Sequence, residues 1–563
     1  MSVPGHDAPY DVPIDQSGLL KATLARLGLF LRIERKILGI IVAYALGIGL
    51  FALIVPLTVQ EMTNTFAFAI QPIMIVTLAG VMAVTLIFIG ALRVLQARAV
   101  EILVQRLYTR IALALTEQLP KFREDRFLPH HANRFAEAEF LPRALVAMLT
   151  DLINVAIGGC IGMTILVMYH PYFLLYNVIL IGGFAFVVTT FGRGGLLITM
   201  KVSDLHYQTL NWLQDVAHNQ LHFKSTASMP LLLKKTDEVV RAYVMARKTR
   251  SDILTGRQYK GAVLWQALGH SGLIATAGWL MAAGQLTLGQ FVAAEVIVGA
   301  LLIHLDTLAR RMYALIYAFT SMHELATLFA HPRDTEPGRM SVALPDPTLH
   351  GVRLTCKDLS FAFPSAPPIF EHFNLDVGPG EKIALLSGTS TGKTTLALVL
   401  AGIHAPTTGV IRYNDVDLRD LDMESLNTCR GLVLDSRLTL FGGTLEENIT
   451  MGRKGIQYED IQWALRFAEL DEEVETMPLG LHTPIQARGK AFTSSQILRI
   501  LVARAVITRP QLLIFDGTLH NMESTTRDII LRRLCSKEEP WSVIFVSNDP
   551  LLIEHVGRRV TVA

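Results

Sequence analysis

The sequence predicts a chain in two parts, an all-α membrane domain of six helices over residues 37–330 and an α/β domain over residues 349–563. Apolar stretches long enough to cross a bilayer crowd the first 330 residues and then stop. From about residue 350, short β-branched or apolar runs alternate with helical patterns. The composition agrees with this division, because 51% of the 563 residues are hydrophobic and only 18% are charged.

The charge balance excludes some classes of protein. The chain has 51 Lys and Arg residues against 49 Asp and Glu residues, a net charge of +2. Nucleic-acid binders carry a basic excess and disordered chains have few apolar residues, so neither class is expected. The four cysteines stand far apart and form no C-x-x-C pair, which favours a reducing, cytosolic environment over a disulfide framework.

Six stretches have the length and hydropathy of membrane spans, since about 20 apolar residues cross about 30 Å of hydrocarbon. Before the first span, residues 1–36 form an N-terminal segment whose amphipathic part, LLKATLARLGLFLRIERK, is expected to lie along the inner interface. The predicted spans cover residues 37–59, 72–95, 148–169, 172–192, 262–283 and 288–308.

The connections between the spans predict their orientation. Those near residues 60–71, 170–171 and 284–287 are short and contain no Lys or Arg, whereas those near 96–147 and 193–261 are long and basic. Positive charge marks the cytoplasmic side. We therefore expect a multi-pass protein of the cytoplasmic (inner) membrane, with the long loops, both termini and the α/β domain in the cytosol.

Polar residues within the spans have two interpretations. An ionisable group inside a bilayer is costly and points to function, but hydrogen bonding between helices explains such groups as well, and we favour it here. Asp306 could also pair with Arg310 one turn away. The glycine-rich run at 158–162 predicts close helix packing. The polar candidates are Asp151, Asn154, Gln266, His270, His304 and Asp306.

A glycine-rich turn, G-T-S-T-G-K at residues 388–393, lies between a strand predicted at 382–387 and a helix predicted at 394–403. Such a turn presents backbone N–H groups and the positive end of a helix to phosphate. Lys393 would reach the outer phosphates and Thr394 would hold Mg²⁺. The match to G-x-x-x-x-G-K-[ST] is incomplete, because Ser387 stands where the first glycine is expected.

A second predicted strand, QLLIF at residues 511–515, is followed by Asp516. In nucleotide-hydrolysing proteins a carboxylate at this place helps to hold Mg²⁺. Two buried strands, one Gly-Lys-Thr turn and one aspartate together predict a site for a nucleotide phosphate and Mg²⁺.

In this order the motifs resemble those of ATP-binding cassette (ABC) exporters, specifically a half-transporter with one six-span domain and one nucleotide-binding domain. The resemblance covers nearly the whole chain and rests on three further stretches. These are TTGVIRYNDVDLRDLDMESL (407–426), GTLEENI (443–449) and ILRILVARAVITRPQLLIFD (497–516).

The resemblance implies a fold and a set of partners. The fold is a six-helix exporter-type transmembrane domain, a linker at 331–348 and an α/β P-loop ATP-binding cassette domain at 349–563. Coupling helices would lie near Phe122–His130 and Asn219–Lys224. The implied partners are a second half-transporter (the same chain or a complete partner), membrane lipid, an unknown exported substrate and a possible periplasmic adaptor.

The chain departs from the family pattern at the positions that support hydrolysis. The family's general base is a Glu after the Walker B aspartate, and here that residue is Gly517. Asn548 stands in place of the switch histidine, and Ser436 in place of a glutamine. The signature L-S-G-G-Q reads F-T-S-S-Q at residues 492–496. No catalytic residue is therefore assigned.

The groups that would bind Mg-ATP are largely kept, with Thr394 and Asp516 as the implied metal ligands and Phe363 as the aromatic residue for adenine stacking. The sequence thus predicts a degenerate site that binds Mg-ATP with impaired hydrolysis. A nucleotide-gated regulatory or channel-like membrane protein, and a scaffold that no longer binds nucleotide, remain open alternatives. The implied nucleotide-binding set is Phe363, Gly388, Ser390, Thr391, Gly392, Lys393, Thr394, Thr395, Ser436, Ser494, Ser495, Gln496 and Asp516.

Overall fold

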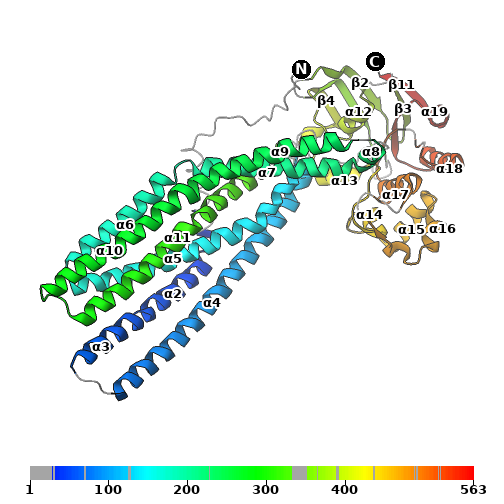
Figure 1. Cartoon of the computed structure of the whole chain (residues 1–563). Coiled ribbons are helices and arrows are strands. Elements are labelled where there is room, and N and C mark those ends of the chain that lie inside the picture. The colour runs from blue at the N-terminus through cyan, green and yellow to red at the C-terminus, as the bar shows by residue number, and fades with distance from the viewer. Residues whose placement is uncertain are drawn as a thin grey trace. The chain divides into compact units, whose positions relative to one another are not determined.

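The chain folds into two compact units, described here from a computed structural model (Figure 1). Unit 1 comprises Met1–Pro120 and Phe127–His331, and unit 2 comprises Lys121–Arg126 and Pro332–Ala563. The predicted linker at 331–348 and most of the N-terminal segment at 1–36 lie outside the described residues. The structure describes residues 28, 32–68, 72–123, 129–226, 228–332, 351–363, 366–387, 392–434, 438–486, 489, 492–517, 519 and 521–562.

Unit 1 is built from long helices that pack along one another, as the ribbons of Figure 1 show. A π-helical segment, Asp252–Tyr259, joins two of them without a loop. The α-helices are α2 (Arg35–Ala52), α3 (Ile54–Phe68), α4 (Pro72–Gln118), α5 (Glu137–Tyr169), α6 (Tyr172–Phe191), α7 (Gly195–His218), α8 (Gln220–Ser225), α9 (Met229–Ser251), α10 (Lys260–Ala282) and α11 (Leu288–Phe329).

Among the described residues, five helical segments are long and apolar enough to cross a membrane, and they contain five of the six predicted spans. The remaining predicted span, 262–283, forms α10 but is not in this set. Its polar residues Gln266 and His270 lower its hydropathy. Several helices run far past the predicted spans; α4 has 47 residues, about 70 Å at ~1.5 Å per residue, more than twice the thickness of the hydrocarbon core.

Hydrogen bonds between helices account for several of the polar residues in the spans, as the favoured interpretation expects. Asn154 and Gln96 exchange two amide hydrogen bonds of 3.0 and 3.3 Å between α5 and α4. His270 lies 3.3 Å from Glu295 on α11. Gln96 and Glu295 were not predicted as partners, because a helical pattern in the sequence gives no sign of which groups will face each other.

Ion pairs and close packing hold other parts of the spans. Asp306 pairs with Arg310 at 2.7 Å, one turn away as predicted, and Asp151 of α5 pairs with Arg311 of α11. A Cβ atom on Gly162 would lie 2.9 Å from Ile297 Cγ2, which confirms the predicted close packing of this part of α5.

Unit 2 contains two main sheets. A parallel sheet has the order β11-β3-β10-β9-β6 and an antiparallel sheet has the order β2-β1-β4-β5. The strands predicted at 382–387 and 511–515 are β3 and β9. The strands are β1 (Leu354–Ala362), β2 (Pro368–Val377), β3 (Lys382–Ser387), β4 (Thr408–Tyr413), β5 (Val416–Asp417), β6 (Arg430–Leu434), β7 (Gly443–Thr444), β8 (Pro484–Ile485), β9 (Leu512–Asp516), β10 (Ser542–Val546) and β11 (Arg558–Val562).

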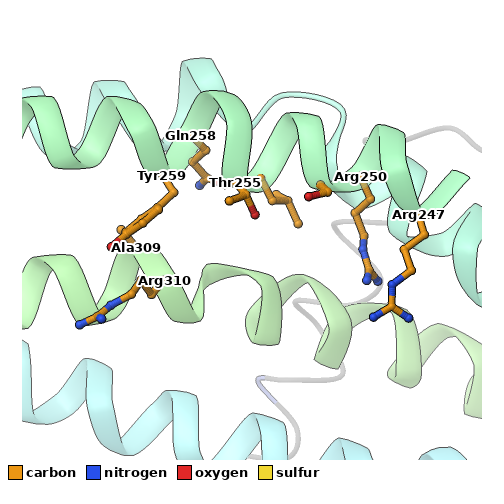
Figure 2. Close-up of a pocket in the computed structure, with 9 residues that line it drawn as sticks. Arg247, Arg250, Thr255, Gln258, Tyr259, Ala309 and Arg310 are labelled. Carbon is orange, nitrogen blue, oxygen red and sulfur yellow. The ribbon is translucent and has the colours of Figure 1, made fainter. Parts of the chain in front are cut away.

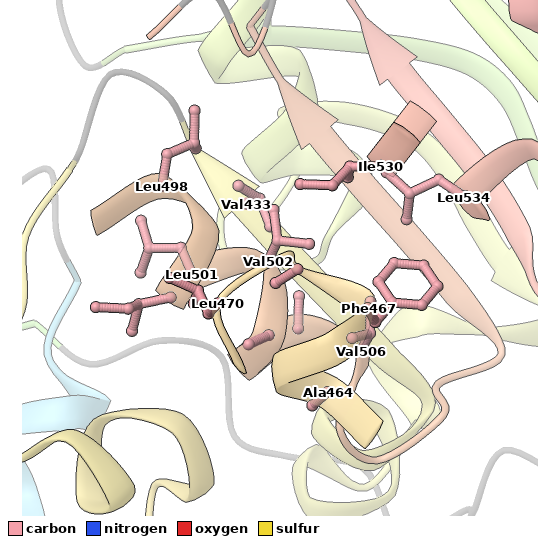
Figure 3. Packing of buried hydrophobic residues seen from close by; sticks show 14 of the residues in the cluster. Val433, Ala464, Phe467, Leu470, Leu498, Leu501, Val502, Val506, Ile530 and Leu534 are labelled. Carbon is pink, nitrogen blue, oxygen red and sulfur yellow. The ribbon is translucent and has the colours of Figure 1, made fainter. Parts of the chain in front are cut away.

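The parallel sheet is buried on both faces, because successive side chains of a strand point to opposite sides. Phe515 and Phe545 enter one apolar cluster, while Ile514 and Ile544 enter the other. Figure 3 shows part of the first cluster, where Val502 and Val506 lie near Val433, Ala464 and Phe467. The helices are α12 (Lys393–Leu400), α13 (Met423–Cys429), α14 (Leu445–Thr450), α15 (Tyr458–Phe467), α16 (Asp471–Thr476), α17 (Ser494–Val506), α18 (Ser524–Cys535) and α19 (Pro550–His555).

The GTLEENI stretch folds around a fully buried asparagine, Asn448. Its side-chain nitrogen donates 3.0 Å bonds to the carbonyls of Phe441 and Thr444, and its side-chain oxygen accepts from the Phe441 N–H at 3.2 Å. Arg504 of α17 donates to both the side-chain and the backbone oxygen of Asn448. Asn448 therefore fixes the loop before α14 to α17, the helix that follows the signature segment.

We expect Asn448→Ala to lower the stability of unit 2 by about 3 kcal/mol, because the hydrogen bonds of this fully buried side chain to Phe441, Thr444 and Arg504 are lost at once. Thermal melting of the purified full-length chain measures this. Asn427→Ala is the matched control, since Asn427 is exposed and accepts one bond from Arg430. Equal melting temperatures for the two variants would contradict the role given to Asn448.

Candidate nucleotide-binding site

Three parallel strands bring the candidate site together at one edge of the sheet. β10 pairs with β3 on one side and with β9 on the other. Their carboxyl ends therefore meet, and Val546 at the end of β10 lies opposite Asp516 at the end of β9. Crevices outside the carboxyl ends of parallel strands are where α/β sheets bind ligands.

Gly392 makes the turn into α12 and can only be glycine. Its φ is +69°, in the left-handed region, and a Cβ atom there would lie 2.0 Å from Ile369 Cγ2. The turn places Lys393, Thr394 and Thr395 in the first turn of α12, half-buried. The N-terminus of a helix carries partial positive charge, so this end of α12 is suited to hold phosphate.

Thr394 and Asp516 meet although they are 122 residues apart in the chain. The Thr394 hydroxyl donates a 2.6 Å hydrogen bond to Asp516 Oδ2, and Asp516 is 6% exposed. Hydroxyl and carboxylate oxygens are the hard donors that Mg²⁺ prefers. The residues that the sequence nominated as metal ligands are thus adjacent, and their chemistry fits the ion.

Phe363, at the end of β1, is half-buried beside two other rings. Its centroid lies 5.1 Å from that of Phe361 and 6.1 Å from that of His404, both in edge-on contacts. Such edge-to-face contacts stabilise the orientation of an aromatic ring. His404 was not foreseen, because it follows α12 in the sequence and only the fold places it next to Phe363.

The signature segment forms the start of α17. Thr493 caps this helix: its hydroxyl accepts from the Gln496 N–H at 3.2 Å, and the Gln496 side-chain oxygen accepts from the Thr493 N–H at 2.9 Å. The Gln496 amide nitrogen also donates to Glu473 at 2.9 Å. Ser494 is exposed and Ser495 half-buried. The T-x-x-Q spacing could have identified Thr493 as the cap, which the sequence analysis missed.

Gly517, directly after Asp516, adopts a backbone conformation that favours glycine. Its φ is +109°, where a Cβ atom collides with the backbone. Its N–H donates to the Val546 carbonyl at 3.2 Å, so the conformation is fixed by the end of β10. The position where a general base was expected therefore has no side chain, and its backbone conformation favours glycine.

Asn548 follows β10 and is exposed. The next residue, Asp549, is an acid close to the site, but its side chain has a structural role. It is 4% exposed, accepts the Leu551 N–H at 3.1 Å as the cap of α19, and faces Arg527 at 3.6 Å. A carboxylate held in this way is poorly suited to accept a proton from water.

Some of the site positions predicted from the sequence are not among the residues that the structure describes. Gly388, Ser390, Thr391 and Ser436 lie outside the described residues, as does part of the predicted coupling segment Phe122–His130. The other predicted coupling segment, Asn219–Lys224, coincides with the short helix α8.

The known proteins to which this chain is similar are ABC transporters. Residues 370–520 match the family model for the ABC transporter domain. A multidrug efflux ATP-binding/permease protein of Mycobacterium bovis is 32% identical over 253 residues, covering 44% of this chain and 20% of that protein. A fatty acid ABC transporter ATP-binding/permease protein of the same species is 29% identical over 269 residues, covering 47% and 41%. The chain thus matches less than half the length of either relative.

A solved structure extends the likeness to nearly the whole chain. A bacterial Atm1-family ABC exporter with ATP bound superposes with a TM-score of 0.80 at 20% sequence identity, covering 91% of this chain and 92% of that one. The chain therefore has the fold of an ABC exporter, in which a helical transmembrane domain is followed by an ABC transporter nucleotide-binding domain.

Proposed function

We propose that this chain is a half-transporter of an ABC exporter in the cytoplasmic membrane that binds Mg-ATP but hydrolyses it poorly at its own site. It would work as a homodimer or beside a complete partner to move a substrate outward. The observation that carries the proposal is the 2.6 Å contact between Thr394 and Asp516 directly beside Gly517.

The groups at the carboxyl edge of the sheet support nucleotide binding. The first turn of α12 offers N–H groups, a partial positive charge and the Lys393 side chain to phosphate. Mg²⁺, held by Thr394 and Asp516, would neutralise phosphate charge when bound. Phe363 offers an aromatic ring for the base of the nucleotide.

Two features of the same edge support impaired hydrolysis. Attack of water on a phosphate is helped by a group that orients it and accepts its proton. Gly517 has no side chain to do so, and the Asp549 carboxylate is taken up by the α19 cap and by Arg527. Asn548 can donate hydrogen bonds but does not gain a charge near neutral pH.

The family resemblance places each nucleotide between the phosphate loop of one chain and the signature of the other. A homodimer would then lack the base at both sites. With a complete partner, the second site would use the partner's base against residues Thr493–Gln496 of this chain. The capped N-terminus of α17 supports anion binding at that second site.

We expect ATP with Mg²⁺ to raise the melting temperature of the full-length chain, because a ligand at about 100 times its Kd stabilises a protein by about 2.7 kcal/mol. Lys393→Ala should remove most of this shift. Lys357→Ala, which removes the same charge from an exposed position on β1, should leave it unchanged. A scaffold that no longer binds nucleotide would give no shift in any of the three proteins.

The rate of ATP hydrolysis by the chain alone should stay well below ~1 s⁻¹, the low end of typical enzyme kcat values. Phosphate release from the purified chain measures this rate. Rapid release that persists in Lys393→Ala would contradict the assigned site. Substrate flux supported by a non-hydrolysable nucleotide would instead favour the nucleotide-gated channel or regulator.

We expect Gly517→Glu, alone or with Asn548→His, to fail to restore turnover, because the new side chain would sit on a backbone with φ near +109°. Gly517→Ala should cost about 1–2 kcal/mol of stability for the same reason. Gly378→Ala is the matched control, since a Cβ atom there meets only an ordinary 3.7 Å contact. A rise in turnover in Gly517→Glu would show that only the side chain was missing.

A further inference from the structure

Two adjoining cavities in unit 1 share two arginines. One has a volume of about 470 Å³ and lies between α9, the π-helical segment and α11. The other has a volume of about 550 Å³ and is lined by α5, α7, α9 and α11. Arg247 and Arg250 of α9 line both. Figure 2 shows these two side chains extending from α9 toward the helix that carries Ala309 and Arg310.

The lining is strongly basic. Arg143, Arg310 and Arg311 join the two shared arginines, and the described residues that line the cavities include no Asp or Glu. Three of the five guanidinium groups are already paired: Arg143 with Glu139 at 3.2 Å, Arg310 with Asp306 at 2.7 Å, and Arg311 with Asp151.

Arg247 and Arg250 differ from the other three. Within the described part of the chain neither has a carboxylate partner, and Arg247 donates only to the Tyr243 hydroxyl, at 2.8 Å. They lie three residues apart on α9, so their side chains leave the same face of the helix. Two neighbouring guanidinium groups without acidic partners are suited to a phosphate or a carboxylate, which arginine binds through two parallel hydrogen bonds.

An apolar wall adjoins these charges. Phe140, Val202 and Ala314 line the larger cavity together with Tyr317. The Tyr317 ring meets that of Phe140 edge-on at 6.4 Å, and its hydroxyl is directed to Glu137 at 3.4 Å. The cavity therefore offers an apolar surface beside the two cations, which fits an amphipathic anion better than an inorganic one.

The π-helical segment supplies part of the smaller cavity. Leu254, Thr255, Gln258 and Tyr259 all line it. π-Helical turns are rare and occur frequently at functional sites. Gln258 is 2% exposed and donates to the Val188 carbonyl of α6 at 3.4 Å, which fixes the segment and leaves Thr255 and Tyr259 on the cavity side, as Figure 2 shows.

The cavities lie at the ends of the apolar stretches. Arg143 precedes the predicted span at 148–169 and Arg310 follows the one at 288–308. At this level of a membrane protein, basic pockets between helices meet the phosphate groups of lipids as well as soluble anions. The same arginine pair could therefore bind either the phosphate group of a lipid or a soluble anion.

We propose that Arg247 and Arg250 bind the phosphate or carboxylate of an amphipathic ligand whose apolar part lies along Phe140, Val202 and Tyr317. Binding requires no nucleotide. The further idea that this ligand is the exported substrate rests on the proposed function. The binding test itself does not, because it would give the same result if the nucleotide-binding domain were inactive.

The test uses the nucleotide-free full-length chain in phosphatidylcholine nanodiscs, with hexyl phosphate as the probe and hexanol as its uncharged analogue. We expect hexyl phosphate to bind and hexanol to bind far more weakly. Arg247→Gln/Arg250→Gln should weaken hexyl phosphate binding at least about tenfold, because charge-assisted hydrogen bonds are lost. Arg241→Gln/Lys248→Gln removes the same charge from exposed positions on α9 outside both cavities and should have no effect.

A second arm separates the two sources of ligand. Phosphatidylglycerol retained by the purified chain, and lost in Arg247→Gln/Arg250→Gln but not in the control, would identify a lipid as the occupant. Binding of hexyl phosphate without retained phosphatidylglycerol would identify a soluble anion. Equal loss of binding in both double variants, or no binding of either probe, would overturn the proposal.

Discussion

The candidate site depends on one contact, the hydrogen bond from Thr394 to Asp516. It joins the first turn of α12 to the end of β9 across β10, so it exists only when β3, β10 and β9 are in register. The buried apolar residues on both faces of the sheet fix that register. The same register sets the backbone of Gly517, through its bond to Val546. The geometry that suits the site to phosphate and the conformation of Gly517 thus depend on the same strand register.

The residues around the end of β9 are held by contacts within this chain. Gly517 occupies a conformation that other residues rarely adopt. Asp549 is held by the α19 cap and Arg527. Gln496 of the signature is hydrogen-bonded within its own chain to Thr493 and Glu473. Each of these contacts stabilises the fold, and together they support the proposal that this site binds nucleotide but hydrolyses it poorly.

In unit 1 the main constraint on polar side chains is the high free-energy cost of leaving a charge unpaired in an apolar environment. Asp151, Asp306 and Asn154 are each matched by a partner on the same or a facing helix. Arg247 and Arg250 differ because their side chains line a cavity in which the described residues include no carboxylate. A pair of cations left in this way is stabilised by water or by an anion, and the neighbouring apolar wall favours an anion with an apolar part.

The sequence by itself determined most of the elements and the positions of the candidate phosphate-binding residues. The hydropathy of the spans, the strands predicted at 382–387 and 511–515, and the Gly-Lys-Thr turn are local patterns, so they are visible along the chain. Only the tertiary structure decided which groups meet: His404 with Phe363, Glu295 with His270, Glu473 with Gln496, and the arginines of α9 with the walls of α5 and α11. The physical reason is that such contacts join distant segments, whose relative placement depends on the packing of the whole unit.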